Sequence, residues 1–562
     1  MKQRLKRFLP KSKKAIIFQI TLNDQTYGGV VVDISLASAS FLFKGVVKDI
    51  EDHVAEAQIT TQNETFSLGK VMVVRHEVQS ASLHIVSEEE DGTDRSGFTL
   101  IVVKALKDHI PLEHLMKYLE SDGQSPYEFE LAHGKFTLAD FYGYSGSDDI
   151  LEKTRLLARM QSEWKQKHSY QYERYRLPSL GKRVRLDRLR PDGRDDYIAF
   201  GSNDYLGFAS HPEVIKAAQS ALAVYGMGST GSPVSTGLSQ EHRMLNEMLA
   251  RMFHKPSSLL FNSGYAANLG ILGALCREKD LVLYDRIVHA SIQDALVFAS
   301  ANGATCLPFR HNDADSLESL LLEHRDHHRG CLVVTEGIFS MDGHIANLEK
   351  MVPLVKKHHA RLFLDVAHDF GVIGENGLGA AEMYGVLKDV DIIMGTFSKI
   401  AGAIGGFVVS SEEVVEYLRV MSRPHIFTVS IPPSTAAAVN KALSLFWEDK
   451  SYLLKLKQNI RYFVRGLRSL GLPIDADHQS TICPVIIGDE AKLDIMTKIL
   501  YDHGVSPTPV VYPVVSRDRC RFRFTVTALH DQSDLDYALV VLRMALLEVG
   551  LIKSLKGTSQ SA

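Results

Sequence analysis

Lys399 has the sequence setting that best suits covalent chemistry. It lies in MGTFSKIAGAIGG (394–406), where an apolar run ends in small residues and one lysine. An amine whose pKa is lowered by desolvation or by nearby cations can attack an aldehyde near neutral pH, whereas a solvated lysine stays protonated. Thr396 and Ser398, just before it, offer hydroxyls and backbone amides that suit a phosphate. The stretch predicts a lysine nucleophile beside an anion site; a solvated lysine is the alternative.

Three further blocks carry side chains that suit a flat, phosphorylated ring. LFLDVAH indicates a strand that ends in Asp365 and is followed by His368, and a carboxylate there can pair with a protonated ring nitrogen. DRIVHAS offers His289, whose imidazole could stack on the ring. FNSGYAAN places Gly264 and Tyr265 at the expected N-terminus of a helix, where backbone amides bind phosphate.

These blocks, in this order, resemble those of the α-oxoamine synthases, the pyridoxal 5′-phosphate (PLP) enzymes that join an amino acid to an acyl thioester with loss of CO2. The resemblance covers roughly residues 160–552. FRHND, GTFSK and RPHIFTVSIPPS are most similar to bacterial serine palmitoyltransferase, which makes 3-ketosphinganine for sphingolipid biosynthesis. DRIVHAS and TEGIFSMDG are equally similar to 8-amino-7-oxononanoate synthase, so a relative that uses alanine or glycine remains an alternative.

The resemblance implies roles for the residues that match its motifs. Lys399 would carry PLP, Asp365 would keep the ring nitrogen protonated, His289 would stack, and His368 would bond the phenolic oxygen. The full set of expected cofactor contacts is Gly264, Tyr265, His289, Ser340, Asp365, His368, Thr396, Ser398, Lys399 and Thr428. Thr428 would reach the cofactor of a partner subunit, which implies a homodimer with shared sites. A non-catalytic scaffold is disfavoured because the main site residues are all present.

The substrate contacts come from two other blocks. In RFRFTVTALH a strand would point Arg521 and Arg523 to one face, which suits bidentate carboxylate binding. By resemblance, Arg523 holds the carboxylate of the amino acid. Asn203 and Tyr205, in FGSNDYLGF, are candidates for contacts with the amino acid or the acyl group, which would arrive on CoA or on an acyl carrier protein.

The sequence departs from the family pattern at four places. Where relatives read Asp-Glu-Ala-His-Ser, Val366 replaces the Glu and Asp369 replaces the Ser. A carboxylate added near the cofactor raises the pKa of its neighbours if buried, but Asp369 could instead face water. Leu378 replaces the Arg of a Gly-Arg-Gly motif, and the Arg that many relatives have near Pro233 is missing.

The elements that must position these residues alternate between strands and helices. This alternation predicts a mainly parallel sheet with helices on both faces, and places the site residues at the C-terminal ends of the strands. The expected strands are 258–261, 281–284, 331–335, 361–365 and 391–394. By resemblance, the fold class is α/β, the PLP-dependent aminotransferase fold type I, with a large domain at 186–440 and a smaller α/β domain at 441–562.

The first third of the chain has a different sequence pattern, which does not alternate between strands and helices. Short β-branched runs between residues 15 and 105, parted by polar clusters, predict a β-rich module over 1–110, followed by a linker and arm at 111–185. Helices are expected at 114–119 and from 149 to about 168. DISLAS, after the basic segment with Arg4 and Arg7, faintly resembles the PilZ domain, although Ser38 stands where that pattern has glycine.

Composition limits the function further. The 562 residues are 45% hydrophobic and 23% charged with a net charge of -4, which gives no overall attraction to nucleic acid. Five cysteines without CxxC or metal-ligand spacing indicate neither a disulfide framework nor a metal site. The sequence shows no membrane span or signal peptide, so we expect a cytoplasmic protein. Residues 1–14 carry seven Lys and Arg and no acid, which leaves peripheral contact with anionic lipid open.

Overall fold

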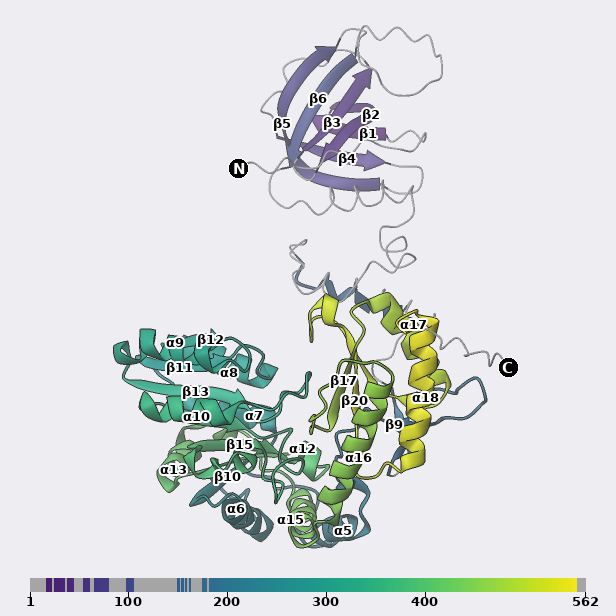
Figure 1. The fold of residues 1–562 in the computed structure, drawn as a ribbon. Coiled ribbons are helices and arrows are strands. Elements are labelled where there is room, and N and C mark those ends of the chain that lie inside the picture. The colour runs from purple at the N-terminus through teal and green to yellow at the C-terminus, as the bar shows by residue number, and fades with distance from the viewer. Residues whose placement is uncertain are drawn as a thin grey trace, which may run out of the picture. The chain divides into compact units, whose positions relative to one another are not determined.

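The structure, a computed structural model, describes residues 174–178 and 181–552, a few residues between 149 and 162, and the strands between 17 and 105. The chain forms two compact units, Met1–Tyr170 and Gln171–Ala562, which we describe separately (Figure 1). Among the described residues, no helix is long and apolar enough to cross a bilayer.

In the first unit, six antiparallel strands close into a barrel in the order β1-β2-β3-β6-β5-β4. The strands are β1 (Ile17–Leu22), β2 (Gln25–Ser35), β3 (Ser38–Lys44), β4 (Val54–Thr60), β5 (Thr65–Gln79) and β6 (Phe98–Ala105). Arg4 and Arg7 lie outside the described residues, as do the basic tail and the helix expected at 114–119. The expected helix that begins at 149 is described only in part. The PilZ-like interpretation of this unit therefore stays a prediction.

The second unit is built on a seven-stranded sheet with the order β10-β16-β15-β14-β13-β11-β12. Its strands are β10 (Ser257–Phe261), β11 (Asp280–Asp285), β12 (Thr305–Phe309), β13 (Gly330–Glu336), β14 (Arg361–Asp365), β15 (Ile392–Thr396) and β16 (Gly406–Ser410). All five strands expected from the sequence are present. The sheet is parallel except for β16, which runs antiparallel to both β10 and β15.

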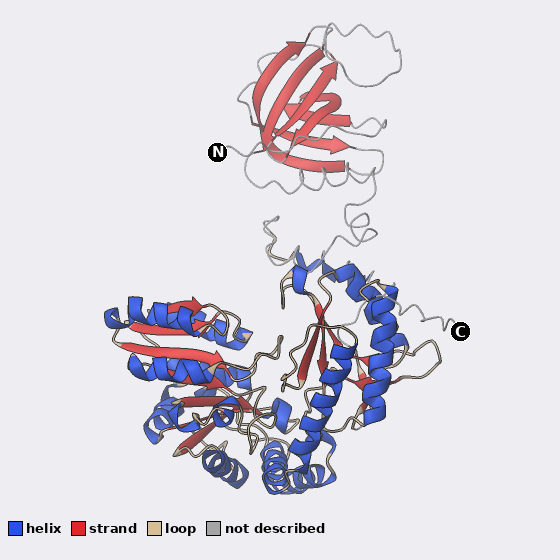
Figure 2. Ribbon diagram, viewed as in Figure 1, coloured by secondary structure: helices blue, strands red, loops and turns tan. Residues whose placement is uncertain are grey.

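Helices cover both faces of this sheet, as Figure 2 shows. Alternate strand residues enter opposite cores, because side chains along a strand point to opposite faces. Phe363 packs in the core formed with α7 (Gly264–Leu275), α8 (Ala290–Ala301) and α13 (Glu412–Met421). Its neighbours Leu362 and Leu364 join the core on the other face. That face is covered by α6 (Gln240–Met252), α9 (Ala314–His324), α10 (Leu348–Lys357) and α15 (Pro433–Glu448).

The C-terminal part forms a smaller layer. Its three-stranded sheet has the order β17-β20-β19, and α16 and α18 lie side by side next to it (Figure 1). The elements are α16 (Ser451–Ser469), β17 (Ile482–Ile486), α17 (Glu490–Asp502), β18 (Val505–Ser506), β19 (Thr508–Val510), β20 (Arg521–Thr525) and α18 (Gln532–Glu548). Further elements are η1 (Phe208–Ser210), α5 (Pro212–Tyr225), η2 (Arg325–His327), α11 (Ala380–Met383), η3 (Leu387–Asp389), α12 (Phe397–Ile400), α14 (Arg423–Ile426) and η4 (Arg517–Arg519).

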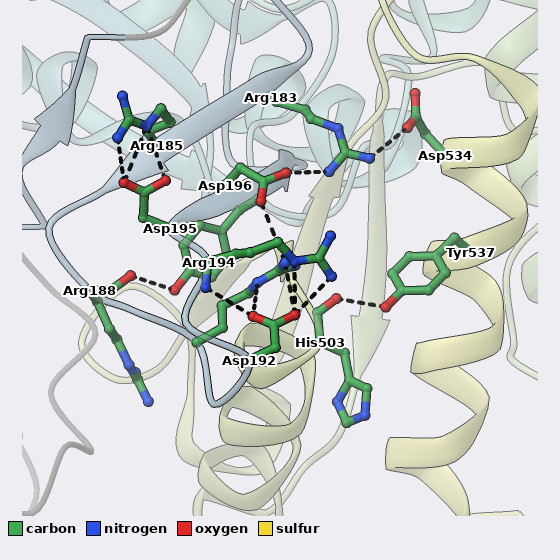
Figure 3. Close-up of polar contacts among 12 residues, drawn as sticks. Arg183, Arg185, Arg188, Asp192, Arg194, Asp195, Asp196, His503, Asp534 and Tyr537 are labelled. Atoms are coloured by element: carbon green, nitrogen blue, oxygen red, sulfur yellow. Dashed lines mark hydrogen bonds and ion pairs between the residues drawn. The ribbon is translucent and has the colours of Figure 1, made fainter.

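An arm before the large domain joins this layer through β18. The arm strands β7 (Arg176–Leu177), β8 (Arg183–Leu186) and β9 (Asp196–Ala199) complete a four-stranded sheet with it. Figure 3 shows the ion pairs that hold the arm: the Arg183 guanidinium lies 2.8 Å from Asp196 and 3.8 Å from Asp534 of α18. These pairs are partly exposed, so we attribute the position of the arm mainly to strand pairing.

Candidate active site

A cavity of about 220 Å³ opens at the C-terminal ends of the parallel strands. Its lining residues follow directly after β10, β11, β13, β14 and β15 or end these strands. They are Ser263, Gly264, Tyr265, Asn268, His289, Ser291, Glu336, Asp365, Ala367, His368, Met394, Thr396, Ser398 and Lys399. A larger cavity of about 420 Å³ lies at the opposite ends of the strands, but its lining contains neither lysine nor histidine. The smaller cavity therefore is the candidate active site.

Lys399 is placed by a sharp turn after β15. The Thr396 hydroxyl caps the short helix α12, donating to the Gly405 carbonyl at 2.8 Å and accepting from the Ser398 amide at 3.2 Å. The turn directs the lysine into the cavity wall, where burial lowers the pKa of its amine to about 8. A substantial fraction of Lys399 is therefore neutral near pH 8, as a nucleophilic amine requires.

The Asp365 carboxylate is held from two sides at the end of β14. Its Oδ1 accepts from the Ala367 amide and its Oδ2 from Asn268 Nδ2, both at 2.9 Å. The Asn268 amide also donates to the Ser291 hydroxyl at 2.9 Å. Both oxygens are thus fixed within the cavity wall, and a carboxylate oriented in this way suits a protonated ring nitrogen.

His289 is the N-cap of α8 and lines the cavity. Its backbone amide donates to Glu336 Oε1 at 2.5 Å, and its Nδ1 lies 2.7 Å from the Ser291 hydroxyl. Burial lowers the pKa of the His289 imidazole and raises the pKa of Glu336 well above its usual value. Glu336 lies beside Asp365, which raises the pKa of Glu336 further, so we expect it to be a neutral acid in this wall.

His368 joins the cavity to a second group of polar residues that do not line it. Its Nδ1 lies 2.7 Å from the hydroxyl of Tyr205, which is fully buried. Burial and the nearby Lys399 hold the pKa of His368 well below its usual value, so the ring is neutral. Arg523 Nη2 donates to Asn203 Oδ1 at 2.9 Å, while its buried Nε has no partner among the described side chains and backbone.

Arg521 and Arg523 have different surroundings, although β20 points both to one face. Arg521 is 1% exposed, and its Nη1 donates to Asp342 at 2.7 Å and to the Met341 carbonyl at 3.1 Å. It therefore ties the C-terminal sheet to the loop after β13. Only Arg523 keeps a buried donor unused, so the expectation that both arginines suit a carboxylate applies to Arg523 alone.

The expected phosphate contacts lie on one side of the cavity. Ser263 caps α7, and Gly264 approaches Thr396 so closely that an added Cβ would lie 3.0 Å from the Thr396 Cβ. The Tyr265 hydroxyl is bonded to Asp294. Thr428 is outside the lining and accepts a hydrogen bond from Asn262 at 2.7 Å, and Ser340 is also outside it. The cofactor roles of Thr428 and Ser340 stay predictions.

Asp369 does not face water. Its side chain is fully buried, with Oδ2 accepting from the Ala380 amide at 2.8 Å and Oδ1 unpaired within the described structure. Gly337 and Gly379 create its space, because an added Cβ would lie 1.8 Å and 2.5 Å from Oδ2, respectively. Burial raises the pKa of Asp369 to about 7. Of the other three departures, Val366 and Leu378 are core residues, 0% and 1% exposed.

Sequence reasoning gave no role to Asn268, Ser291 or Glu336, which complete the cavity wall. Asn268 is the last residue of the FNSGYAAN block, one helical turn after Gly264, and this spacing was the available signal. His311, in the FRHND block, bonds both Asp285 oxygens at 3.1 Å and lies outside the cavity lining.

The cavity residues fit a phosphorylated pyridine aldehyde. A buried amine, a fixed carboxylate, a flat imidazole and a helix N-terminus with hydroxyls all face one space, and each matches one part of that molecule. The Asn268 Oδ1 is buried and lacks a partner in the described part of the chain. It offers an acceptor for the hydroxyl or water that would accompany a bound ring.

Comparisons with known proteins agree with this geometry. Residues 195–542 match the family described as aminotransferase class I and II. The chain is 35% identical over 416 residues to the 4-hydroxy-2,2'-bipyrrole-5-methanol synthase PigH of a Serratia species, covering 74% of this chain but only 63% of that relative. It is 36% identical to the 8-amino-7-oxononanoate synthase of Treponema denticola, over 63% of this chain and 89% of the relative.

Solved structures of similar fold include the serine palmitoyltransferase of Sphingomonas wittichii. The TM-score is 0.68 with 32% sequence identity, and the match covers 72% of this chain and 100% of that chain.

Proposed function

The chain belongs to the aminotransferase class I and II family, within which it is a PLP-dependent α-oxoamine synthase, and from this premise we propose that it condenses L-serine with a long-chain acyl-CoA. The product would be 3-ketosphinganine, formed with release of CO2 and CoA. The observation that carries the proposal is the convergence of Lys399, Asp365, His289 and His368 on one cavity. Likeness to serine palmitoyltransferase, which extends over the whole of that chain, supports serine as the amino acid.

PLP, when bound, supplies an aldehyde for an amine and a ring that withdraws electrons from the α carbon of an amino acid. Lys399 would hold it, because its amine has a lowered pKa and faces the cavity. Asp365, fixed by Asn268, would keep the proton on the ring nitrogen. His289 would stack on the ring, and the amide of Gly264 with the hydroxyls of Thr396 and Ser398 would bind the phosphate.

The other residues act on the substrate. Arg523 would bind the amino-acid carboxylate through its guanidinium, whose Nη2 donates to Asn203 and whose buried Nε lacks a partner within the described residues. The Nζ of Lys399 would take the proton from the α carbon of the amino acid, because a neutral amine near pH 8 can accept one. Glu336, which is 2% exposed and lines the cavity, would help to exclude water from the reacting carbon.

A second candidate uses alanine or glycine with a different acyl group. Sequence identity of 36% to 8-amino-7-oxononanoate synthase favours it, as does the match to the Serratia synthase. The acyl carrier, CoA or an acyl carrier protein, is a further alternative. Both candidates share the residues above and would differ in the pocket for the side chain and acyl group.

A product assay tests the proposal. The purified chain with PLP, L-serine and palmitoyl-CoA should yield 3-ketosphinganine by mass spectrometry, and Lys399→Ala should yield none. Parallel reactions replace L-serine with alanine or glycine and use acyl-CoAs of several chain lengths. A product from alanine or glycine but not from serine would replace the first candidate with the second. Bound PLP without any product would refute both.

We further propose a homodimer with shared sites. Thr428 lies between Phe427 and Val429, which are 73% and 52% exposed. Exposed apolar residues beside a half-buried hydroxyl suit a subunit interface that would bring Thr428 to the partner's cofactor.

A further inference from the structure

Tyr205 occupies an unusual position for a residue that was expected to contact substrate. It lies in the loop between β9 and η1, is 0% exposed, and is absent from the lining of the cavity. Its hydroxyl lies 2.7 Å from Nδ1 of His368, which does line the cavity. Burial raises the pKa of this phenol, while the nearby Arg523 and Thr481 act to lower it. One buried hydroxyl outside the lining is thus bonded to a residue of the proposed site.

The surroundings of the Tyr205 hydroxyl fix the direction of its hydrogen bond to His368. Thr481 Oγ1 has no hydrogen-bond partner within the described residues, so the acceptor at hydrogen-bond distance from the phenol is His368 Nδ1. Burial raises the pKa of Tyr205, so the hydroxyl keeps its single proton. That proton has His368 Nδ1 as its acceptor, and a neutral imidazole whose Nδ1 accepts must carry its own proton on Nε2.

No other hydrogen bond sets the tautomer of His368 within residues 181–552. The ring is 4% exposed and neutral, and its surroundings are the cations Lys399 and Arg523 and the imidazole of His289. These cations disfavour a charged imidazole, but they do not determine which of its two neutral tautomers forms. The hydrogen bond from the hydroxyl of Tyr205 determines the tautomer.

We propose that Tyr205 is a positioning residue that holds His368 as its Nε2–H tautomer. This inference rests on the proposed function for the role of His368. His368 then presents a fixed donor to the cavity, which suits the phenolate oxygen of the cofactor ring.

Tyr205→Phe tests the proposal because it keeps the ring and removes only the hydroxyl. Tyr197→Phe is the matched control: Tyr197 is equally buried, and its hydroxyl donates to the Arg188 carbonyl, away from the cavity. We expect Tyr205→Phe to weaken PLP binding about tenfold and to shift the pH midpoint of the bound-cofactor absorbance by about one unit. Tyr197→Phe should change neither.

A double-mutant cycle separates this role from a structural one. In a His368→Ala background, Tyr205→Phe should no longer shift the absorbance midpoint, whereas a general packing defect would act equally in both backgrounds. A shift that persists without His368 overturns the proposal. If the cofactor binds to the wild-type chain and Tyr205→Phe changes nothing, the proposal also fails while the proposed function stands.

A measurement that needs no cofactor can test the proposal even if PLP does not bind to the chain. Deuterium exchange at the imidazole C2 position, followed by mass spectrometry of the His368 peptide, reports the protonation of this ring. The Tyr205→Phe variant lacks the hydroxyl that stabilises the neutral ring of His368. The pH midpoint of the exchange at His368 should therefore rise by about one pH unit in this variant. An unchanged exchange profile in a folded Tyr205→Phe variant overturns the proposal.

Discussion

Asn268 donates a hydrogen bond of 2.9 Å from Nδ2 to Oδ2 of Asp365, and both residues are buried. The bond crosses from the helix α7 to the end of β14 and fixes the carboxylate in the cavity wall. Asn268→Ala should therefore weaken PLP binding about tenfold or more, because a hydrogen bond to a buried carboxylate contributes about 1.5–3 kcal/mol.

Titration of the cofactor-free protein with PLP measures the dissociation constant for this variant. Asn440→Ala is the control, since Asn440 is also buried but donates to the Glu241 carbonyl at 3.0 Å, outside the cavity lining. Equal affinity of the two variants would show that the Asn268 contact does not support the cofactor site.

Lys399 should react with the PLP aldehyde in a pH-dependent way. Only the neutral amine attacks, so a pKa of about 8 means that the attachment rate rises with pH and levels off above about pH 8. Borohydride trapping, followed by mass spectrometry of the Lys399 peptide, gives the rate at each pH. A rate still rising at about pH 10 would indicate an ordinary solvated lysine. Lys399→Arg provides the blank.

Asp369 should make stability depend on pH. Its pKa is raised from 3.8 to about 7 in the folded chain, so between these values the folded state binds more protons than the unfolded state. The contribution of Asp369 to stability is complete below pH 3.8 and is lost as the pH rises through 7. Asp369→Asn removes this titration.

Thermal unfolding at several pH values measures the effect. The melting temperature of Asp369→Asn relative to wild type should increase from pH 5 to pH 8, whereas Asp477→Asn, at an exposed turn, should show a constant difference. A constant difference for Asp369→Asn as well would mean that its carboxyl is ionised throughout.

The sequence predicted the strands that carry the site because each is a short apolar run with a polar residue at its end. Two strands of the seven-stranded sheet were not predicted. β12 contains Pro308 at the edge of the sheet, and β16 starts at Gly406, in a glycine-rich stretch that was expected to pass close to the ring. Edge and glycine-rich strands depend on pairing with neighbours, which a single segment does not reveal.

The site was predicted only as far as local motifs extend. Lys399, Asp365, His289 and His368 were identified from their own blocks, and the structure brings them to one cavity. The burial of Asp369 was not predictable, because Gly337 and Gly379, eight or more residues away in the chain, leave its space. Tertiary contacts of this kind have no periodic signal in the sequence.

Phe427 should contribute to a subunit interface. It is 73% exposed beside Thr428, so Phe427→Asp would place a charge in the proposed dimer contact. We expect a shift toward monomer in sedimentation velocity and weaker PLP binding, because each site would lose the Thr428 of its partner. Leu322→Asp, on α9 and 67% exposed, is the control and should leave both unchanged. A dimer that persists in Phe427→Asp would place the interface elsewhere.

Variants of Arg523 and Arg521 should have different effects: substitution of Arg523 should weaken substrate binding, and substitution of Arg521 should lower the stability of the fold. Arg523 has a buried, unpaired Nε, so Arg523→Lys should raise the KM for the amino acid about tenfold or more through the loss of bidentate binding, with little change in melting temperature. Arg521 is paired with Asp342 at 2.7 Å and is 1% exposed. Arg521→Ala should therefore lower stability by about 3–5 kcal/mol.

Steady-state kinetics and thermal unfolding on both variants provide the comparison. Arg519→Lys is the control, because Arg519 also reaches Asp342, at 3.2 Å, but is about half exposed, with 48% of its side chain accessible. If Arg521→Ala raises the KM for the amino acid and Arg523→Lys does not, the carboxylate binds at Arg521 and the assignment of the two residues must be exchanged. If neither variant changes the KM, the substrate carboxylate is bound outside β20, since this strand presents only these two cations.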